Sequence, residues 1–286
     1  MLIEAKIKSK GAFTMKNWKK RMAAALLTAV MAAGVVANAT PASAAILTAK
    51  QYLAKMEKAS KKAKSYETTQ TTTVKVSQEG QNVTSKTTAK QIVFQNPVKS
   101  KAVTTVKVTG DGIEQESKSV VYIKETAKGN IYEYVSVDGS EYERINITDI
   151  FSNANAVDTS LYSDARIAKN SVKVNKNDTV QISAKVKGAD MAKALEVLGM
   201  TEDQTSELGV DYKTLDLIKV TLWIDKKTYL PVKATTDMAA FYNGYFKSMY
   251  EAMGAESDIS YTTAKSTVTY KNFNKATKFK FPDFSK

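Results

Sequence analysis

Apolar and polar residues alternate along most of the chain beyond residue 65. In one run, Val180, Ile182 and Ala184 fall on one side of the alternation, while Gln181 and Ser183 fall on the other. A period of two is typical of β-strands whose two faces meet different surroundings. Short clusters of Gly, Asn and Asp separate the runs, as turns between strands require. The pattern predicts about eleven strands, near residues 65–77, 82–95, 100–109, 113–125, 129–137, 141–148, 168–175, 179–187, 215–225, 229–237 and 259–272.

Helical spacing replaces this alternation in three places. The first helix is expected to start after Thr48, a suitable N-cap, and to carry a narrow apolar face beside many lysines. The second begins at Asp190 and stops at Gly199. The third, residues 238–253 (MAAFYNGYFKSMYEAM), gathers three Met, two Phe and three Tyr. Residues 149–165 are polar and turn-rich, and predict a loop or a short helix.

Strands that follow one another through short turns favour one large curved antiparallel sheet over βαβ units. The expected fold class is therefore α+β. Residues 45–286 are numerous enough to bury a sizeable core, and we expect them to form a single domain.

Residues 1–44 predict an export signal. From Met15 the chain reads MKNWKKR, then an Ala-rich apolar run, then NATPASA. We expect cleavage after Ala44, with Ala39 as the weaker site. An uncleaved anchor is the alternative, but the apolar run over 22–37 is shorter than the ~20 residues of a membrane span. The first 14 residues precede this second start, so the true start is either Met1 or Met15.

Composition removes several classes of function. The 286 residues include no Cys and no His, which excludes disulfides, thiol nucleophiles, a lipidated cysteine and every site that needs histidine. Lys and Arg number 42 against 29 Asp and Glu. Without residues 1–44 the balance is 35 against 28, a net charge of +7. We interpret the excess as solvated lysines of an extensive sheet, with weak attraction to an anionic membrane or cell wall as the alternative. No motif indicates nucleic acid.

No catalytic pattern is present either. The chain has no G-x-S-x-G elbow and no phosphate loop. Carboxylate pairs such as Glu114 and Glu116 lie two residues apart on a strand face, without any sign of burial. We therefore expect a protein that is not an enzyme and that has no cofactor and no metal.

One run has a family resemblance. KVTLWIDKKTYLPVKATTDM (Lys219–Met238) resembles a hairpin of the LolA/LppX-like (lipoprotein-carrier-like) superfamily, in which a strand ending in W-I-D turns through K-K-T into a strand beginning L-P-V-K. SYETTQTTTVKV after the first helix and QIVFQNPVKSK around Pro97 are also similar. The chain looks like the uncharacterised exported LolA-like proteins of Gram-positive bacteria. The resemblance implies an open half-barrel of about eleven antiparallel strands, whose concave, apolar face is covered by helices and accommodates acyl chains.

The same hairpin has a purely structural interpretation. Asp225 suits the cap of a four-residue turn, and Pro231, which lacks a ladder donor, suits the start of a strand. The missing lipidated cysteine departs from many members of the superfamily. It favours a freely secreted or wall-retained protein.

These observations lead to two hypotheses. The first is an exported carrier or binder of a lipid, an acyl chain or a lipoprotein-like amphiphile, monomeric, with residues 238–253 as a mobile cover. The second is a structural or interaction module whose half-barrel is filled by its own helices and whose outer face binds cell-wall polymer or a protein. In the second, the aromatic stripe of 238–253 is simply core. Candidate ligand-lining residues, chosen for size and position, are Phe94, Tyr122, Tyr132, Phe151, Leu195, Trp223, Phe241, Tyr245 and Met249.

Overall fold

The computed structural model describes residues 47–78, 80–148, 161–187, 210, 212–252, 254–256 and 258–284. The expected signal peptide and the expected helix at 190–199 lie outside them. The described chain forms α3 (Ala49–Lys62), β1 (Ser65–Gln78), β2 (Gln81–Gln95), β3 (Val98–Gly110), β4 (Ile113–Glu125), β5 (Ile131–Val137), β6 (Glu143–Asn146), β7 (Tyr162–Val174), β8 (Asn177–Val186), a 3-10 turn (Tyr212–Thr214), β9 (Ile218–Asp225), β10 (Pro231–Asp237), α7 (Ala239–Ala252) and β11 (Ser260–Lys271).

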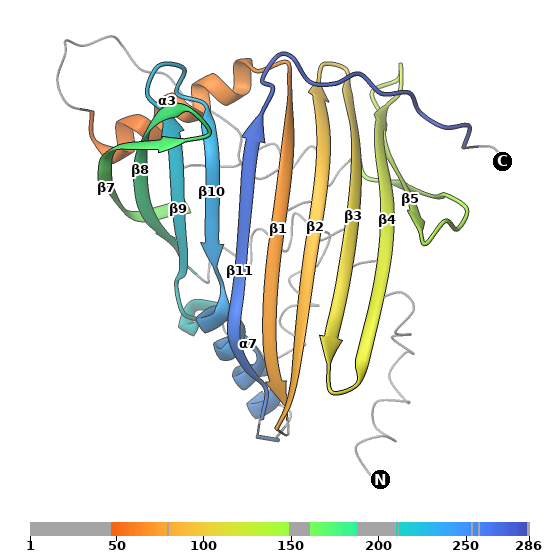
Figure 1. Ribbon diagram of the computed structural model, residues 1–286, viewed down its shortest axis with the longest axis vertical. Helices are drawn as coiled ribbons and strands as arrows, with labels where there is room; N and C mark the ends of the chain where they lie inside the picture. The colour runs from red at the N-terminus through yellow and green to blue at the C-terminus, as the bar shows by residue number, and fades with distance from the viewer. Residues whose placement is uncertain are drawn as a thin grey trace.

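The strands form one antiparallel, open and curved sheet, with helices on its concave face (Figure 1). Their order is β6-β5-β4-β3-β2-β1-β11-β10-β9-β8-β7, so the first and last strands meet in the middle. The α+β half-barrel expected from the sequence is confirmed. Of the described helices, none is long and apolar enough to cross a bilayer.

The register divides the sheet into two faces, because directly paired residues point to the same side. One row runs from Ile182 through Leu222, Ala234, Val268, Gln70, Ala89, Thr104 and Ser119 to Val137. Ile182 and Leu222 pack in one core with side chains of α3 and α7. This row therefore marks the concave face, called the inner face below. Along each strand, every second residue counted from the member of this row also faces inward, and the residues in between form the outer face.

The main core lies at one half of the inner face. Leu53 and Met56 of α3 and Phe241 of α7 pack there against the buried side chains of β8 and β9. α3 starts with a capping box in which Thr48 and Gln51 exchange side-chain and backbone hydrogen bonds. Thr48 is thus the N-cap that the sequence predicts. The protein's own helices fill this half of the half-barrel.

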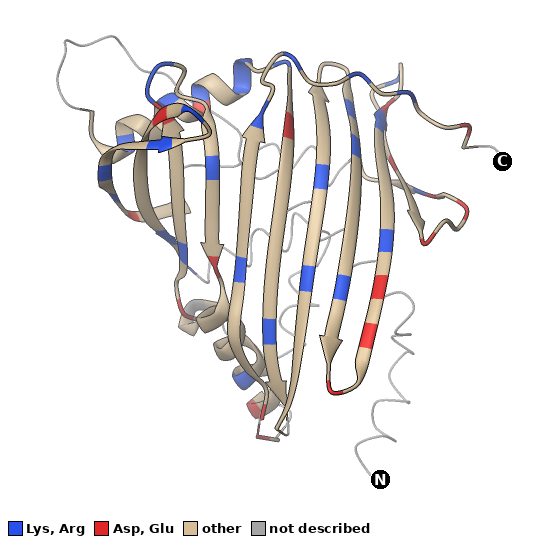
Figure 2. Ribbon diagram, in the orientation of Figure 1, with Lys and Arg blue, Asp and Glu red and all other residues tan. Residues whose placement is uncertain are grey.

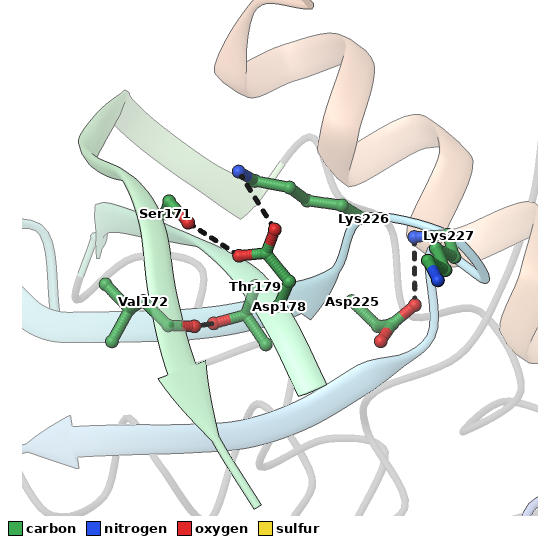
Figure 3. Close-up of polar contacts among 7 residues, drawn as sticks. All are labelled: Ser171, Val172, Asp178, Thr179, Asp225, Lys226 and Lys227. Atoms are coloured by element: carbon green, nitrogen blue, oxygen red, sulfur yellow. Dashed lines mark hydrogen bonds and ion pairs between the residues drawn. The ribbon is translucent and has the colours of Figure 1, made fainter. Parts of the chain in front are cut away.

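The β9–β10 hairpin is held by a carboxylate (Figure 3). Asp225 Oδ1 accepts hydrogen bonds from the backbone N of Lys227 (2.9 Å) and of Thr228 (2.7 Å). Beside it, Asp178 accepts a 2.6 Å hydrogen bond from the Ser171 hydroxyl and lies 3.7 Å from Lys226 Nζ. The Ser171 bond holds the pKa of Asp178 below its usual value. These contacts support the structural interpretation of the W-I-D-K-K-T motif.

The largest difference from the expected strand boundaries is at the start of β7. β7 begins at Tyr162 rather than near residue 168, so residues 162–165 belong to a strand instead of a loop. The register of β7 against β8 shifts at three places, after Ser163, after Ile167 and after Lys169. Each shift interrupts the period of two, which is the signal that sequence analysis uses to find a strand.

Candidate functional site

Three of the predicted ligand-lining residues belong to α7. Phe241 is buried in the main core, and Tyr245 and Met249 pack against that core from the same helix. The rings of Tyr212 and Tyr245 are 6.1 Å apart, and burial raises the pKa of both tyrosines. The structure therefore brings these three residues together, as packing between α7 and the sheet.

α7 is also fastened to the sheet by polar contacts. The Asn243 side chain accepts a 2.6 Å hydrogen bond from Tyr261 N and donates one of 3.1 Å to Tyr261 O. The rings of Tyr242 and Phe246 lie 5.2 and 5.4 Å from that of Tyr261. At Gly244 an added Cβ would meet Leu215 Cδ2 at 3.4 Å. The helix is thus docked along β11.

Four other predicted residues lie on the outer face. Phe94 pairs with Ser65, Tyr122 with Lys101, Tyr132 with Lys124 and Trp223 with Lys233. The ammonium of Lys233 sits 4.8 Å from the centre of the Trp223 ring. The register separates these four side chains from the residues of α7 by the thickness of the sheet, so they do not line the inner face. Phe151 and Leu195 lie outside the described residues.

The C-terminal segment gives the outer aromatics their partner, which sequence analysis missed. After β11 the chain crosses the outer face towards β5 (Figure 1). The ring of Phe279 lies 6.1 Å from that of Phe94, and Phe284 stacks on Tyr134 at 3.8 Å. Tyr122 contacts both of these phenylalanines. The signal was the spaced aromatic run FKFPDF at 279–284.

Glu67 anchors this C-terminal strap (residues 272–284) to β1. Its carboxylate accepts hydrogen bonds from Thr277 N (2.8 Å), Thr277 Oγ1 (2.7 Å) and Asn272 Nδ2 (2.9 Å). Burial by itself would raise the pKa of Glu67. The hydrogen bonds and Lys271, 3.6 Å away, outweigh burial and hold that pKa below its usual value.

The inner face of β1–β5 has a different lining from the helix-filled half. Near the free edge, Ala102, Val121, Val135 and Val137 form a small apolar cluster, called the inner apolar patch below. Ile123, Ile131 and Ile147 form a second cluster close to it. An exposed large apolar side chain also lies here, since Ile145 of β6 is 42% exposed; Ile113, which is 47% exposed, lies at the far end of β4, opposite Gly110. This region is suited to apolar contact.

Buried polar side chains occupy the middle of the same face. We call this set the inner polar patch; its members are Gln70, Thr72, Thr87, Gln91, Ser100, Thr104 and Ser266. Gln70 Nε2 donates to Thr72 Oγ1 (3.2 Å) and to Ser266 Oγ (3.0 Å). Gln91 Nε2 donates to Ser100 Oγ at 3.2 Å. Gln70 Oε1, Gln91 Oε1 and Thr104 Oγ1 are buried without a hydrogen-bond partner.

The lysines of β1–β5 and β8–β11 point to the other side of the sheet. Lys90 lies next to Gln91 in β2 and points outward, as its pairing with Thr69 and Val103 shows. By the register, the same holds for every lysine of β1–β5 and β8–β11, whose positions along the strands Figure 2 marks in blue. They are Lys75, Lys86, Lys90, Lys99, Lys101, Lys107, Lys118, Lys124, Lys185, Lys219, Lys233, Lys265 and Lys271.

One carboxylate faces inward on β5. Glu133 pairs with Ile123 and Ile145, and its Oε1 is buried without a hydrogen-bond partner. Burial raises the pKa of Glu133, because the charged form loses its hydration. No group of three acidic side chains that could hold a metal occurs within the described part of the chain. The inner face of β1–β5 is thus an uncharged to weakly acidic surface.

Comparison with known proteins places the chain in a family. No curated protein matches it in sequence. Lipoprotein LppX of Mycobacterium tuberculosis is a similar solved structure, with 14% identity over 79% of this chain and 95% of that chain and a TM-score of 0.45. A putative outer membrane lipoprotein-sorting protein domain of Vibrio parahaemolyticus has 12% identity over 76% and 88% and a TM-score of 0.25. A DUF1329 family protein of Desulfovibrio piger has 10% identity over 78% and 90% and a TM-score of 0.24. The model of a family of unknown function, DUF6612, matches residues 48–285, and the chain belongs to that family.

Proposed function

We propose that the protein is an exported, non-enzymatic carrier or binder of a lipid-like amphiphile, held against the inner face of β1–β5. The observation that carries this proposal is the separation of the two faces. Lysines occupy the outer face, whereas small, apolar and neutral polar side chains line the inner face. An uncharged concave surface with apolar clusters suits an acyl chain or the lipid part of a lipoprotein.

The location of the site follows from the packing of the helices. α3 and α7 supply the apolar side chains that fill the half around β8 and β9. A ligand therefore finds its place on the other half, beside the inner apolar patch and the exposed Ile145. The resemblance of Lys219–Met238 to the LolA/LppX-like superfamily favours the same function. We assign α7 the role of a cover that borders the site along β11.

Export is the part of the proposal that rests on sequence alone. The basic, apolar and small-residue regions of 1–44 favour secretion, with release near Ala44. The absence of cysteine leaves no residue for a lipid anchor. We therefore propose an extracellular or wall-associated monomer.

The absence of cysteine also gives a clean test of ligand location. Val106 and Thr105 are neighbours on β3. Both are half-buried, and they point to the inner and the outer face respectively. The two test variants are Val106→Cys and Thr105→Cys. Each variant is reacted with a maleimide, with and without dodecanoate. We expect dodecanoate to slow labelling at position 106 several-fold and to leave position 105 unchanged. Equal rates at position 106 with and without dodecanoate would contradict the proposed site.

The outer face supports a second candidate, binding of an anionic cell-wall polymer. Lys86 stands directly opposite Lys107, Lys99 opposite Lys124, and Lys185 opposite Lys219. Like charges in such positions destabilise a sheet, and an anionic partner would relieve them. Sedimentation with isolated cell walls tests this candidate. Binding that disappears at high salt supports it, and binding that is independent of salt argues against it.

A further inference from the structure

The inner polar patch leaves polar atoms unsatisfied where almost no solvent reaches them. Gln91 and Thr104 are each 2% exposed and Gln70 is 5% exposed. Gln91 Oε1, Thr104 Oγ1 and Gln70 Oε1 have no hydrogen-bond partner. Buried polar atoms in folded proteins are nearly always paired, so three unpaired atoms on one surface point to a missing partner.

The three groups surround two alanines. Ala89 pairs with Gln70 on one side and with Thr104 on the other, and Ala102 pairs with Gln91. Gln70 and Thr104 are therefore two inter-strand spacings apart, about 10 Å, with small side chains between them. This arrangement sets two methyl groups between the polar groups on the inner face. The spacing of the polar groups matches that of hydroxyl groups on one or two sugar rings or a similar polyol.

The charges indicate what kind of polar group fits. The lysines of the neighbouring strands point outward, so a phosphate or carboxylate at this place would have no counter-charge from these strands. The two glutamine amides each leave one polar atom free, whichever way round the amide is placed. A hydroxyl donates and accepts, and therefore satisfies either orientation. A neutral, hydroxyl-bearing group matches the patch best.

We infer that the inner polar patch binds the hydroxyl groups of a neutral head group, and that the attached chain extends over the inner apolar patch. Ala102 and Thr104 connect the two patches, since Ala102 faces Val121 and Thr104 faces Ser119, which faces Val137. This inference rests on the proposed carrier function and names its ligand class as a glycolipid-like or polyol-bearing amphiphile.

Calorimetric titration with two probes of equal chain length tests the inference. The probes are dodecyl maltoside, below its micellar concentration, and dodecanoate. The variants are Thr104→Val and Gln91→Leu, with Thr105→Val as the matched control that changes the same residue type on the outer face. We expect the protein to bind the maltoside more tightly than dodecanoate. Each inner variant should weaken maltoside binding roughly tenfold and leave dodecanoate binding unchanged.

The outcomes separate this inference from the proposed function. Retained dodecanoate binding shows that a variant is folded. If both probes bind and neither inner variant affects the maltoside more than dodecanoate, the head-group assignment is overturned and the carrier function stands. If dodecanoate binds and the maltoside does not, the head-group assignment is also overturned and the carrier function stands. If neither probe binds to the wild-type protein, both proposals are overturned. Thr105→Val should change neither affinity, and a tenfold loss in this control would also overturn the assignment.

Discussion

At the scale of single residues, two carboxylates on opposite faces of the sheet have pKa shifts of opposite sign. Glu133 faces inward, and burial without a hydrogen-bond partner for Oε1 raises its pKa. Glu67 faces outward under the C-terminal strap. Burial by itself would raise the pKa of Glu67, but the hydrogen bonds from Thr277 and Asn272 hold that pKa low. The difference lies in the partners, because both side chains lose solvent.

Replacing Glu133 should stabilise the protein at neutral pH. A raised pKa means that the contribution of Glu133 to stability is fully present below its ordinary value of 4.5 and is lost as the pH rises through the folded-state value. Glu133→Gln keeps the shape and removes the charge. We expect urea unfolding at pH 7 to show a higher free energy of unfolding than the wild type, and the gain to shrink near pH 4. Glu116→Gln, on the exposed outer face, controls for the loss of one negative charge; a gain as large there would contradict this account.

Replacing Glu67 should have the opposite effect. A lowered pKa means that the stabilisation is present above the ordinary value of 4.5 and is lost as the pH falls through the folded-state value. Glu67→Gln weakens the charge-assisted bonds to Thr277 and should lower the free energy of unfolding at pH 7 by about 1–3 kcal/mol. The deficit should narrow as the pH falls below 4. A deficit that is independent of pH would mean that shape rather than charge anchors the strap.

Single residues were predicted from the sequence only where a local rule applied. Thr48 as a cap and Asp225 as the centre of a turn follow from spacing alone, and both are confirmed. Ring size did not predict which face of the sheet a residue lies on. Trp223 alternates with Lys219 and Thr221 in β9, so the period of two already put it on the lysine face. The period of two therefore predicts the face of a strand residue better than ring size does.

At the scale of elements, α7 is stabilised by Asn243 and weakened by Gly244. Asn243 makes two hydrogen bonds to Tyr261, whereas Gly244 costs about 1 kcal/mol relative to alanine in a helix interior. The Cβ of an alanine at position 244 would meet only Leu215 Cδ2, at ordinary contact distance. The two neighbouring residues therefore offer variants of opposite effect.

Hydrogen exchange measures this balance. Asn243→Ala should speed the exchange of α7 amides severalfold or more, because it removes the link to β11, while Gly244→Ala should slow it by up to about fivefold. The amides of β2 and β3 provide the internal reference and should not change. If both variants shifted β2 and β3 as much as α7, the helix would not open as a separate unit.

The limits of the strands could be predicted because most of them keep a strict period of two between turn residues. β1, β2, β4, β5 and β11 agree with the expected ranges within about two residues. The prediction fails for β7 because the register of this strand shifts. It fails for the strap because the sequence there has no regular period. The packing of the strap depends on Phe94, Tyr122 and Tyr134, which are distant in sequence. Local patterns carry no information about such contacts.

At the scale of the whole molecule, lysines stand opposite one another on the outer face, although Lys107 and Lys185 also form ion pairs with Glu114 and Asp164. Three directly opposed lysine pairs repel each other across neighbouring strands. Salt screens such interactions, since the Debye length is about 30 Å at 0.01 M and about 10 Å at 0.1 M. We expect the free energy of unfolding to rise with sodium chloride over this range. The triple variant Lys86→Gln, Lys99→Gln, Lys219→Gln should be more stable than the wild type at low salt, and its free energy of unfolding should depend less on sodium chloride. The same salt dependence as in the wild type would contradict the repulsion.

The central claim is that the inner face of the half-barrel holds a lipid-like ligand. Native mass spectrometry of the protein purified without detergent, before and after organic extraction, tests this claim most directly. The account predicts additional bound mass that extraction removes and that fragments as an amphiphile with an acyl chain. A single clean mass before extraction, together with no uptake of dodecanoate or dodecyl maltoside afterwards, would contradict it.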